Sequence, residues 1–176
     1  SKEVADAISE LDVQVCMTRE DHQSGTERLS EVITQLGFDD DKILINLQGD
    51  EPLMPADTIN QVALNLLNND DAHCATLFTN IDVSDEASNP KMVKVIHDKD
   101  GMALYFSRSC IHFNRDDAEG NPVIYTRHIG LYAYRVATLK AFSSLDKSEL
   151  ENTEKLEQLR LIENGMKIHV AEAIAL

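Results

Sequence analysis

The sequence predicts an α/β fold of Rossmann-like form, with a mostly parallel sheet that helices cover on both faces. Strand-like apolar runs alternate with helix-like periodic runs along the first half of the chain, an order that favours parallel strands. In the second half, Asp98-Lys99-Asp100-Gly101 separates two strand-like runs and indicates a hairpin. We therefore expect one domain over residues 1–176, with an antiparallel β insertion near residues 91–135.

Apolar spacing and helix-capping residues define the elements of the first half. Ser24 or Thr26 is expected near the start of the second helix, and Gly37 at its end. The run KILINLQ is rich in large apolar residues, which indicates a buried strand. The expected elements are a helix at 2–11, a strand at 12–18, a helix at 24–37, a strand at 42–48 and a helix at 55–69.

The second half begins with strands and ends with helices. Two strands are expected around the hairpin turn, and Asn164-Gly165 should close the last helix. The expected elements are strands at 72–81, 92–98, 102–108 and 129–136, helices at 136–145 and 151–165, and a final strand at 167–174.

Composition limits the class of protein. The hydrophobic content of 43% and charged content of 27% are those of a soluble globular domain. A net charge of −15 repels a phosphate backbone, so we expect no nucleic-acid partner. Apolar runs long enough for a membrane span, or typical of a secretory signal, are missing, which favours the cytoplasm and no membrane partner. Cys16, Cys74 and Cys110 are too far apart for a disulfide framework.

The segment QGDEP places two carboxylates directly after a buried strand. Ligands bind outside the carboxyl ends of strands in open α/β sheets. Asp50 and Glu51 offer the oxygen ligands that Mg²⁺ prefers. The alternative is that the chain simply turns into solvent there.

The segment REDHQSGTER places Ser24, Gly25 and Thr26 at a helix start, where free backbone N–H groups favour an oxygen-rich ligand. Arg19 and Arg28 flank these residues. The alternative is an ordinary N-cap followed by a solvated helix.

Two later segments carry polar and aromatic groups. ALYFSR ends a strand at Arg108, and in RHIGLYAYR the alternation of a strand puts His128, Tyr132 and Tyr134 on one face. Basic groups and phenols on one sheet face suit a polyol that bears a carboxylate. The helical segment EKLEQLR holds Glu157 and Gln158, which pattern alone would assign to a charged solvent face.

Five segments taken in order, DHQSGTER, INLQGDEP, ALYFSR, RHIGLYAYR and EKLEQLR, closely resemble the 3-deoxy-manno-octulosonate (KDO) cytidylyltransferases. This family makes CMP-KDO and pyrophosphate from CTP and KDO for lipopolysaccharide assembly. The resemblance implies a nucleotidyltransferase α/β domain with a dimerising β insertion, hence a homodimer. It also implies Mg²⁺ as the cofactor.

The resemblance assigns a role to each candidate residue. Asp50 would ligate Mg²⁺ and, with Arg108, act in catalysis, while Glu51 would support the site. The nucleotide would lie against Ser24, Gly25, Thr26, Glu27, Arg28 and Gln48. The sugar would lie against Gln48, Arg108, His128, Tyr132, Glu157 and Gln158, with Arg108 paired to its carboxylate.

The chain also departs from the family. Members open with a phosphate-binding loop of the form IPARxxSxRLPGKPL, whereas this chain begins SKEVADAISE. Members continue into a GVDTPEDL-type segment with a second metal carboxylate, whereas this chain ends AEAIAL. We therefore expect an internal portion of the family fold, whose activity alone is open.

Two alternatives remain at this point. One is a related enzyme that acts on a sialic acid or an amino-KDO. The other is a non-catalytic, receiver-like domain with Asp50 as phosphoacceptor, which also needs a lysine at a later strand end; that lysine is not evident.

Overall fold

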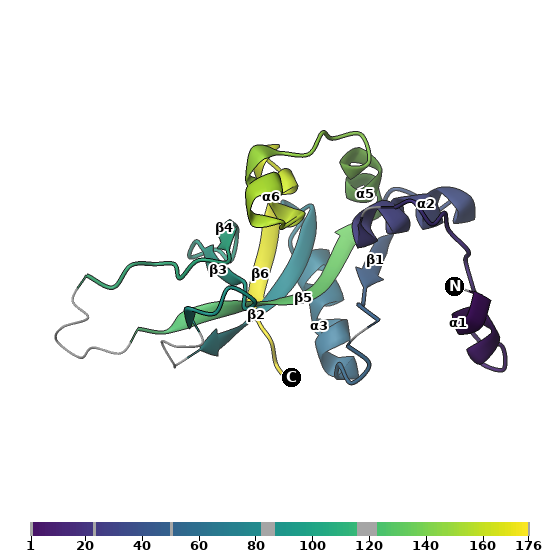
Figure 1. Ribbon diagram of the computed structural model, residues 1–176, viewed down its shortest axis with the longest axis horizontal. Coiled ribbons are helices and arrows are strands. Elements are labelled where there is room, and N and C mark those ends of the chain that lie inside the picture. The colour runs from purple at the N-terminus through teal and green to yellow at the C-terminus, as the bar shows by residue number, and fades with distance from the viewer. Residues whose placement is uncertain (1, 23, 50, 82–86, 116–122, 176) are drawn as a thin grey trace.

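The computed structural model describes residues 2–22, 24–49, 51–81, 87–115 and 123–175 (Figure 1). The helices are α1 (Lys2–Ala7), α2 (Gly25–Leu36), α3 (Ala56–Leu67), α5 (Val136–Phe142), α6 (Glu149–Glu154) and α7 (Gln158–Glu163). The strands are β1 (Ile43–Asn46), β2 (Cys74–Ile81), β3 (Lys94–His97), β4 (Ala103–Ser107), β5 (Tyr125–Arg135) and β6 (Ile168–Glu172).

The described strands form one mixed sheet. Its order is β4-β3-β5-β2-β6, and β1 also pairs with β5. β2 and β6 are parallel, while β5 is antiparallel to β1, β2 and β3. β1, β2 and β6 therefore share one direction, as the α/β prediction requires, but β5 lies between β1 and β2. The α/β class and the antiparallel β3–β4 hairpin are confirmed. The sheet is mixed and not mostly parallel, since β2–β6 is the one parallel pair among the described strands.

Helices cover both faces of the sheet (Figure 1). One apolar cluster joins Ile33 of α2 and Leu139 of α5 to Phe78 of β2. A second cluster, on the face that α3 covers, joins Val62 to Leu77. Strand alternation assigns neighbouring β2 residues to opposite clusters, because successive side chains of a strand point to opposite faces.

Several helix ends follow the sequence signals. Ser24 caps α2 by accepting a hydrogen bond from the backbone N–H of Glu27, and Gly37 ends the helix with a positive φ of 64°. Ser148 begins α6 with a reciprocal capping box that involves Glu151.

Three local predictions need correction. Residues 12–18 form no strand; Val13, Val15 and Met17 are exposed, and no described strand pairs with this segment. β1 is only partly buried, because β5 is its one partner among the described strands. The helix expected at 151–165 is two helices, because Lys155 adopts a left-handed conformation with a φ of 55°.

Candidate functional site

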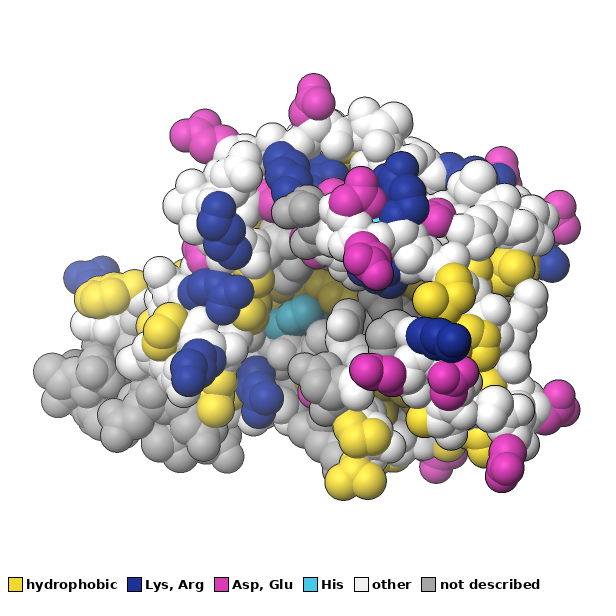
Figure 2. Space-filling model, turned by 45° about the vertical axis from the view of Figure 1, so that its right-hand side comes forward, with side chains coloured by type: hydrophobic (Ala, Val, Ile, Leu, Met, Phe, Trp, Pro, Cys, Tyr) yellow, Lys and Arg dark blue, Asp and Glu magenta, His cyan; other side chains and the backbone are white. Residues whose placement is uncertain are grey.

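A cavity of about 410 Å³ brings together segments that lie far apart in the sequence. Its walls are the start of α2, the end of β1, one face of β5 and the α6–α7 junction. Figure 2 shows such a hollow, with a histidine side chain visible inside it. Of the predicted site residues, seven line the cavity: Gly25, Thr26, Gln48, His128, Tyr132, Glu157 and Gln158.

The start of α2 forms the first wall. A Cβ atom added to Gly25 would lie 3.9 Å from the side-chain amide nitrogens of both Asn46 and Gln48, so α2 closely approaches the end of β1. Thr26 is buried and its side chain hydrogen-bonds to Tyr134. The predicted nucleotide segment and Gln48 thus belong to one wall.

One face of β5 forms the floor. His128, Tyr132 and Tyr134 line the cavity together, as the alternation of a strand predicts. The His128 and Tyr132 ring centroids are 5.3 Å apart, and those of Tyr132 and Tyr134 are 5.4 Å apart. Burial raises the pKa of both tyrosines well above its usual value and lowers the pKa of His128 to about 3. At neutral pH the floor is therefore uncharged.

The α6–α7 junction forms the third wall. The left-handed turn at Lys155 ends α6, and residues 156–158 then run along the cavity. Glu154 anchors this turn: its carboxylate accepts hydrogen bonds from Ser107 Oγ at 2.6 Å and from the Arg108 backbone N–H at 3.0 Å. Glu157 and Gln158 line the cavity directly after this break, at the start of α7.

Arg108, expected to pair with a carboxylate, lies behind this third wall. Its Nε donates to the backbone carbonyl of Glu154 at 2.7 Å, and its terminal nitrogens donate to the carbonyls of Pro90 at 3.0 Å and Lys155 at 3.4 Å. The guanidinium thus joins the α6–α7 junction to the loop that precedes β3.

Lys94 is a buried charged residue that the sequence pattern did not single out. It is fully buried, and its Nζ donates to the carbonyls of Asn89 at 3.1 Å, Met92 at 2.5 Å and Arg108 at 2.7 Å. Burial lowers the pKa of this ammonium group. The signal in the sequence was a lysine inside an apolar strand, since lysine is almost never fully buried unless its charge has partners.

Three of the predicted nucleotide-binding residues do not line this cavity: Ser24, Glu27 and Arg28. Ser24 caps α2. Arg28 is exposed; one of its terminal nitrogens donates to Thr18 Oγ1 and, at 2.9 Å, to the carbonyl of Arg19. Glu27 lines a second cavity, of about 660 Å³.

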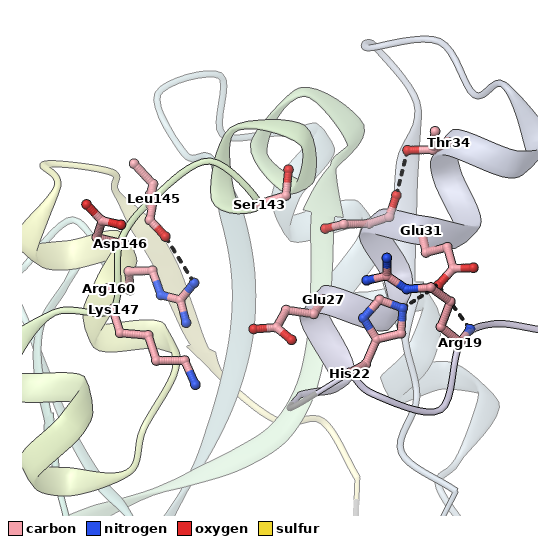
Figure 3. Close-up of a pocket in the computed structure, with 11 residues that line it drawn as sticks. Arg19, His22, Glu27, Glu31, Thr34, Ser143, Leu145, Asp146, Lys147 and Arg160 are labelled. Carbon is pink, nitrogen blue, oxygen red and sulfur yellow. Dashed lines mark hydrogen bonds and ion pairs between the residues drawn. The ribbon is translucent and has the colours of Figure 1, made fainter.

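This second cavity lies between α2 and the segments around α6 and α7 (Figure 3). Arg19, His22 and Glu31 occupy one side, with a hydrogen bond between His22 and Glu31, and Lys147 and Arg160 occupy the other. The hydrogen bond from His22 is the main cause that lowers the pKa of Glu31. Arg19 pairs with Asp21 and Glu31. Arg160 pairs with Glu151, so both guanidinium groups already have partners within the protein. The 410 Å³ cavity is therefore the stronger candidate site.

Asp50, the predicted metal ligand, lies outside the described residues. Its neighbour Glu51 is exposed and lines a small cavity of about 280 Å³ together with Arg127 and His128. The described part of the chain contains no cluster of three or more His, Cys, Asp or Glu residues that could hold a metal ion.

A family model described as cytidylyltransferase matches residues 1–168 of the chain. The chain belongs to the cytidylyltransferase family. Relatives named 3-deoxy-manno-octulosonate cytidylyltransferase are 50% identical in Colwellia psychrerythraea and 49% identical in Photobacterium profundum, each over 97% of this chain. The relative of that name from Yersinia enterocolitica is 50% identical over 98% of this chain. The resemblance found in the sequence is therefore confirmed.

Among solved cytidylyltransferase structures, that of a CMP:2-keto-3-deoxy-manno-octonic acid synthetase complexed with CTP superimposes with a TM-score of 0.87 and 38% identity. The match covers 98% of this chain and 70% of that one. The chain spans about two thirds of its relatives' length, 66% for Colwellia psychrerythraea and 70% for Photobacterium profundum. None of the helices described for this family member is long and apolar enough to cross a bilayer.

Proposed function

We propose that the protein transfers the cytidylyl group of CTP to KDO, which gives CMP-KDO and pyrophosphate for lipopolysaccharide synthesis. The observation that carries this proposal is the single cavity lined by seven residues of the nucleotide and sugar motifs. The relatives that share these motifs are named for the same reaction.

The transfer is an in-line displacement at phosphorus. The anomeric hydroxyl oxygen of KDO forms a bond to the α-phosphorus of CTP, the bond to the bridging oxygen breaks, and pyrophosphate leaves with the electron pair. The hydroxyl proton passes to a water molecule during the attack. Such reactions depend mainly on the positioning of the two substrates and on electrostatic stabilisation.

The walls of the cavity suit the two substrates differently. The backbone N–H groups at the start of α2 favour an anionic or oxygen-rich group, and Gly25 leaves room for its approach. Gln48 belongs to the same wall, and its amide can donate to or accept from either substrate. Across the cavity, His128, Glu157 and Gln158 offer the hydrogen-bonding groups that sugar hydroxyls need.

We also propose Mg²⁺ as the cofactor, with Asp50 as a ligand. The support is chemical: a carboxylate next to a triphosphate site is the usual Mg²⁺ environment. When bound, the ion offsets the charge that develops on the phosphate oxygens. Because the described residues do not form a metal centre, the roles given above for the cavity residues do not depend on the ion.

The experiment is pyrophosphate release by the purified protein with CTP, KDO and Mg²⁺. Release that requires all three, and that EDTA abolishes, is the expected result. A sialic acid or an amino-KDO replaces KDO in parallel reactions, and faster release with either would transfer the assignment to that sugar acid. If no pyrophosphate is released, calorimetry then measures CTP binding. A protein that binds CTP without turnover keeps the assignment to this site, whereas a protein that binds no CTP contradicts the proposed function.

We further propose a homodimer that acts in the cytoplasm. Leu104, Phe113 and Ile124 of the β insertion are large exposed apolar residues, as is typical of a surface that another chain covers. Cys16, Cys74 and Cys110 are free thiols, a state that a reducing compartment maintains. Sedimentation at several protein concentrations tests the dimer, and a stable monomer would exclude it.

A further inference from the structure

Thr76 lies on β2, the strand beside β5, and its hydroxyl is within hydrogen-bond distance of three polar atoms of β5. The side chain of Tyr132 is a further polar neighbour of this hydroxyl. Its Oγ1 is 3.0 Å from the carbonyl oxygen of Ile129, 2.8 Å from that of Leu131 and 3.0 Å from Nε2 of His128. The side chain is fully buried, so water does not compete for these contacts.

A strand irregularity produces this arrangement. The β2–β5 register shifts between Thr76 and Leu77: Thr76 pairs with Tyr132, whereas Leu77 pairs with Ile129. Two extra residues of β5 therefore lie opposite this step, and both nearby carbonyls converge on one hydroxyl. Such bulges re-aim side chains and are common next to functional sites.

The single hydrogen of the Thr76 hydroxyl determines which ring nitrogen of His128 carries a proton. A threonine hydroxyl has one hydrogen to donate and two lone pairs to accept with. If that hydrogen pointed at His128, two carbonyl oxygens would face the hydroxyl oxygen at hydrogen-bond distance without a proton between them. The hydrogen therefore points toward the two carbonyls, to both of which the Thr76 hydroxyl is a donor, and Nε2 of His128 is the donor to Thr76.

The other ring nitrogen of His128 is then an acceptor. Burial lowers the pKa of His128 to about 3, so the ring holds one proton at neutral pH, and Nε2 carries it. Nδ1 makes no hydrogen bond with any described residue, and the ring lines the cavity. The cavity floor thus presents an unprotonated nitrogen.

We propose that Thr76 is a positioning residue that fixes His128 as the Nε2–H tautomer, so that Nδ1 accepts a hydrogen bond from a hydroxyl of the sugar substrate. The choice of a sugar as the partner rests on the function proposed above; the tautomer does not. A neutral acceptor at this point selects a substrate with a hydrogen-bond donor. A ligand that presents an ether or carbonyl oxygen there would be rejected, because two acceptors would face each other.

The tautomer is tested first, on the free protein. In ¹⁵N NMR of histidine-labelled protein at neutral pH, His128 should show a protonated Nε2 and an unprotonated Nδ1. Assignment uses the His128→Gln variant, in which these signals disappear. A protonated Nδ1 in the wild-type protein would overturn the proposal, whatever the outcome of the activity assays.

Two substitutions then test the part played by Thr76. Thr76→Val keeps the shape but removes the hydroxyl, and Nδ1 should gain proton occupancy. The KM for KDO should rise about tenfold, the loss of one hydrogen bond, with little change in the KM for CTP. Thr76→Ser should restore both the NMR signature and the KM.

The outcomes separate this proposal from the proposed function. A Thr76→Val protein that keeps the Nε2–H tautomer and a wild-type KM would overturn the part played by Thr76. Circular dichroism shows whether the valine variant is folded. If it is not, the NMR spectrum of the wild-type protein and the Thr76→Ser variant still test the tautomer of His128. If the wild-type protein shows the expected tautomer but does not use KDO, the proposed function fails while the Thr76–His128 pairing stands.

Discussion

Arg108 and Glu154 hold each other through backbone groups. Nε of Arg108 donates to the backbone carbonyl of Glu154 at 2.7 Å, and the Arg108 backbone N–H donates to the Glu154 carboxylate at 3.0 Å. Ser107 Oγ adds a hydrogen bond of 2.6 Å to the same carboxylate. The last turn of α6 is thus fixed to the end of β4, beside the wall that carries Glu157 and Gln158.

Glu154→Gln should weaken this connection. The amide replaces a charged acceptor that serves both Ser107 and the Arg108 backbone, so we expect a loss of about 1–2 kcal/mol in the free energy of unfolding. The KM for KDO should rise more than the KM for CTP, because the wall beside the sugar shifts. Urea unfolding and steady-state kinetics measure the two effects.

Glu149→Gln is the matched control, since Glu149 is an exposed carboxylate of the same helix. It should leave the KM for KDO unchanged. Equal effects of the two substitutions would show that the net charge of α6, and not the contacts of Glu154, is responsible.

Lys94→Met should destabilise the protein while its neighbour Lys91→Met does not. The buried ammonium group of Lys94 serves three backbone carbonyls, whereas Lys91 is exposed. Methionine fills the space but leaves these acceptors unpaired, which should cost about 2–4 kcal/mol. Denaturant midpoints compare the two variants, and a stable Lys94→Met protein would contradict the role given to this lysine.

His128 should make stability depend on pH below neutrality. Its folded pKa of about 3 lies below the 6.5 of an unfolded histidine, so the unfolded state takes up the proton first as the pH falls. The contribution is complete above pH 6.5 and is lost as the pH decreases from 6.5 toward 3. Between pH 7 and pH 5 the loss is about 2 kcal/mol.

The measurement is urea unfolding of the wild-type protein and of His128→Gln at pH 7 and pH 5. From pH 7 to pH 5, the free energy of unfolding of His128→Gln should fall by about 2 kcal/mol less than that of the wild-type protein. At pH 7 the variant should be the less stable of the two. Parallel losses in the two proteins would mean that His128 is charged in the folded state.

The buried pair of Arg160 and Glu151 should tolerate joint replacement better than single replacement. Arg160 Nε and Nη2 donate to the two carboxylate oxygens of Glu151 at 2.7 and 2.5 Å, and both side chains are nearly inaccessible. Glu151→Gln leaves a buried guanidinium without its counter-ion, which should cost about 3–5 kcal/mol. Arg160→Met leaves the carboxylate unpaired, with a similar cost.

The double variant Glu151→Gln/Arg160→Met removes both charges, so its loss should be clearly smaller than the sum of the two single losses. Thermal unfolding of the four proteins gives the coupling. Additive losses would show that the pair contributes nothing beyond its separate contacts.

The sequence by itself determined the local elements and the chemical character of the site. Period-two alternation placed His128, Tyr132 and Tyr134 on one strand face, and capping residues placed Ser24 and Gly37 at the ends of α2, because these signals depend on neighbours along the chain. Because these signals report only on neighbours along the chain, they also led to incorrect predictions. Residues 12–18 have the composition of a strand, but a strand forms only where another offers its backbone groups.

Only the tertiary structure decided how the segments meet. Next to the left-handed turn at Lys155, Glu154 bonds to Ser107 of β4, 47 residues away in sequence. The proton position on His128 depends on a hydroxyl of another strand. Burial and hydrogen-bond geometry arise when distant segments pack together, and no local pattern contains them. For that reason the sequence named the residues of the cavity, while packing decided which of them face a ligand and in what protonation state.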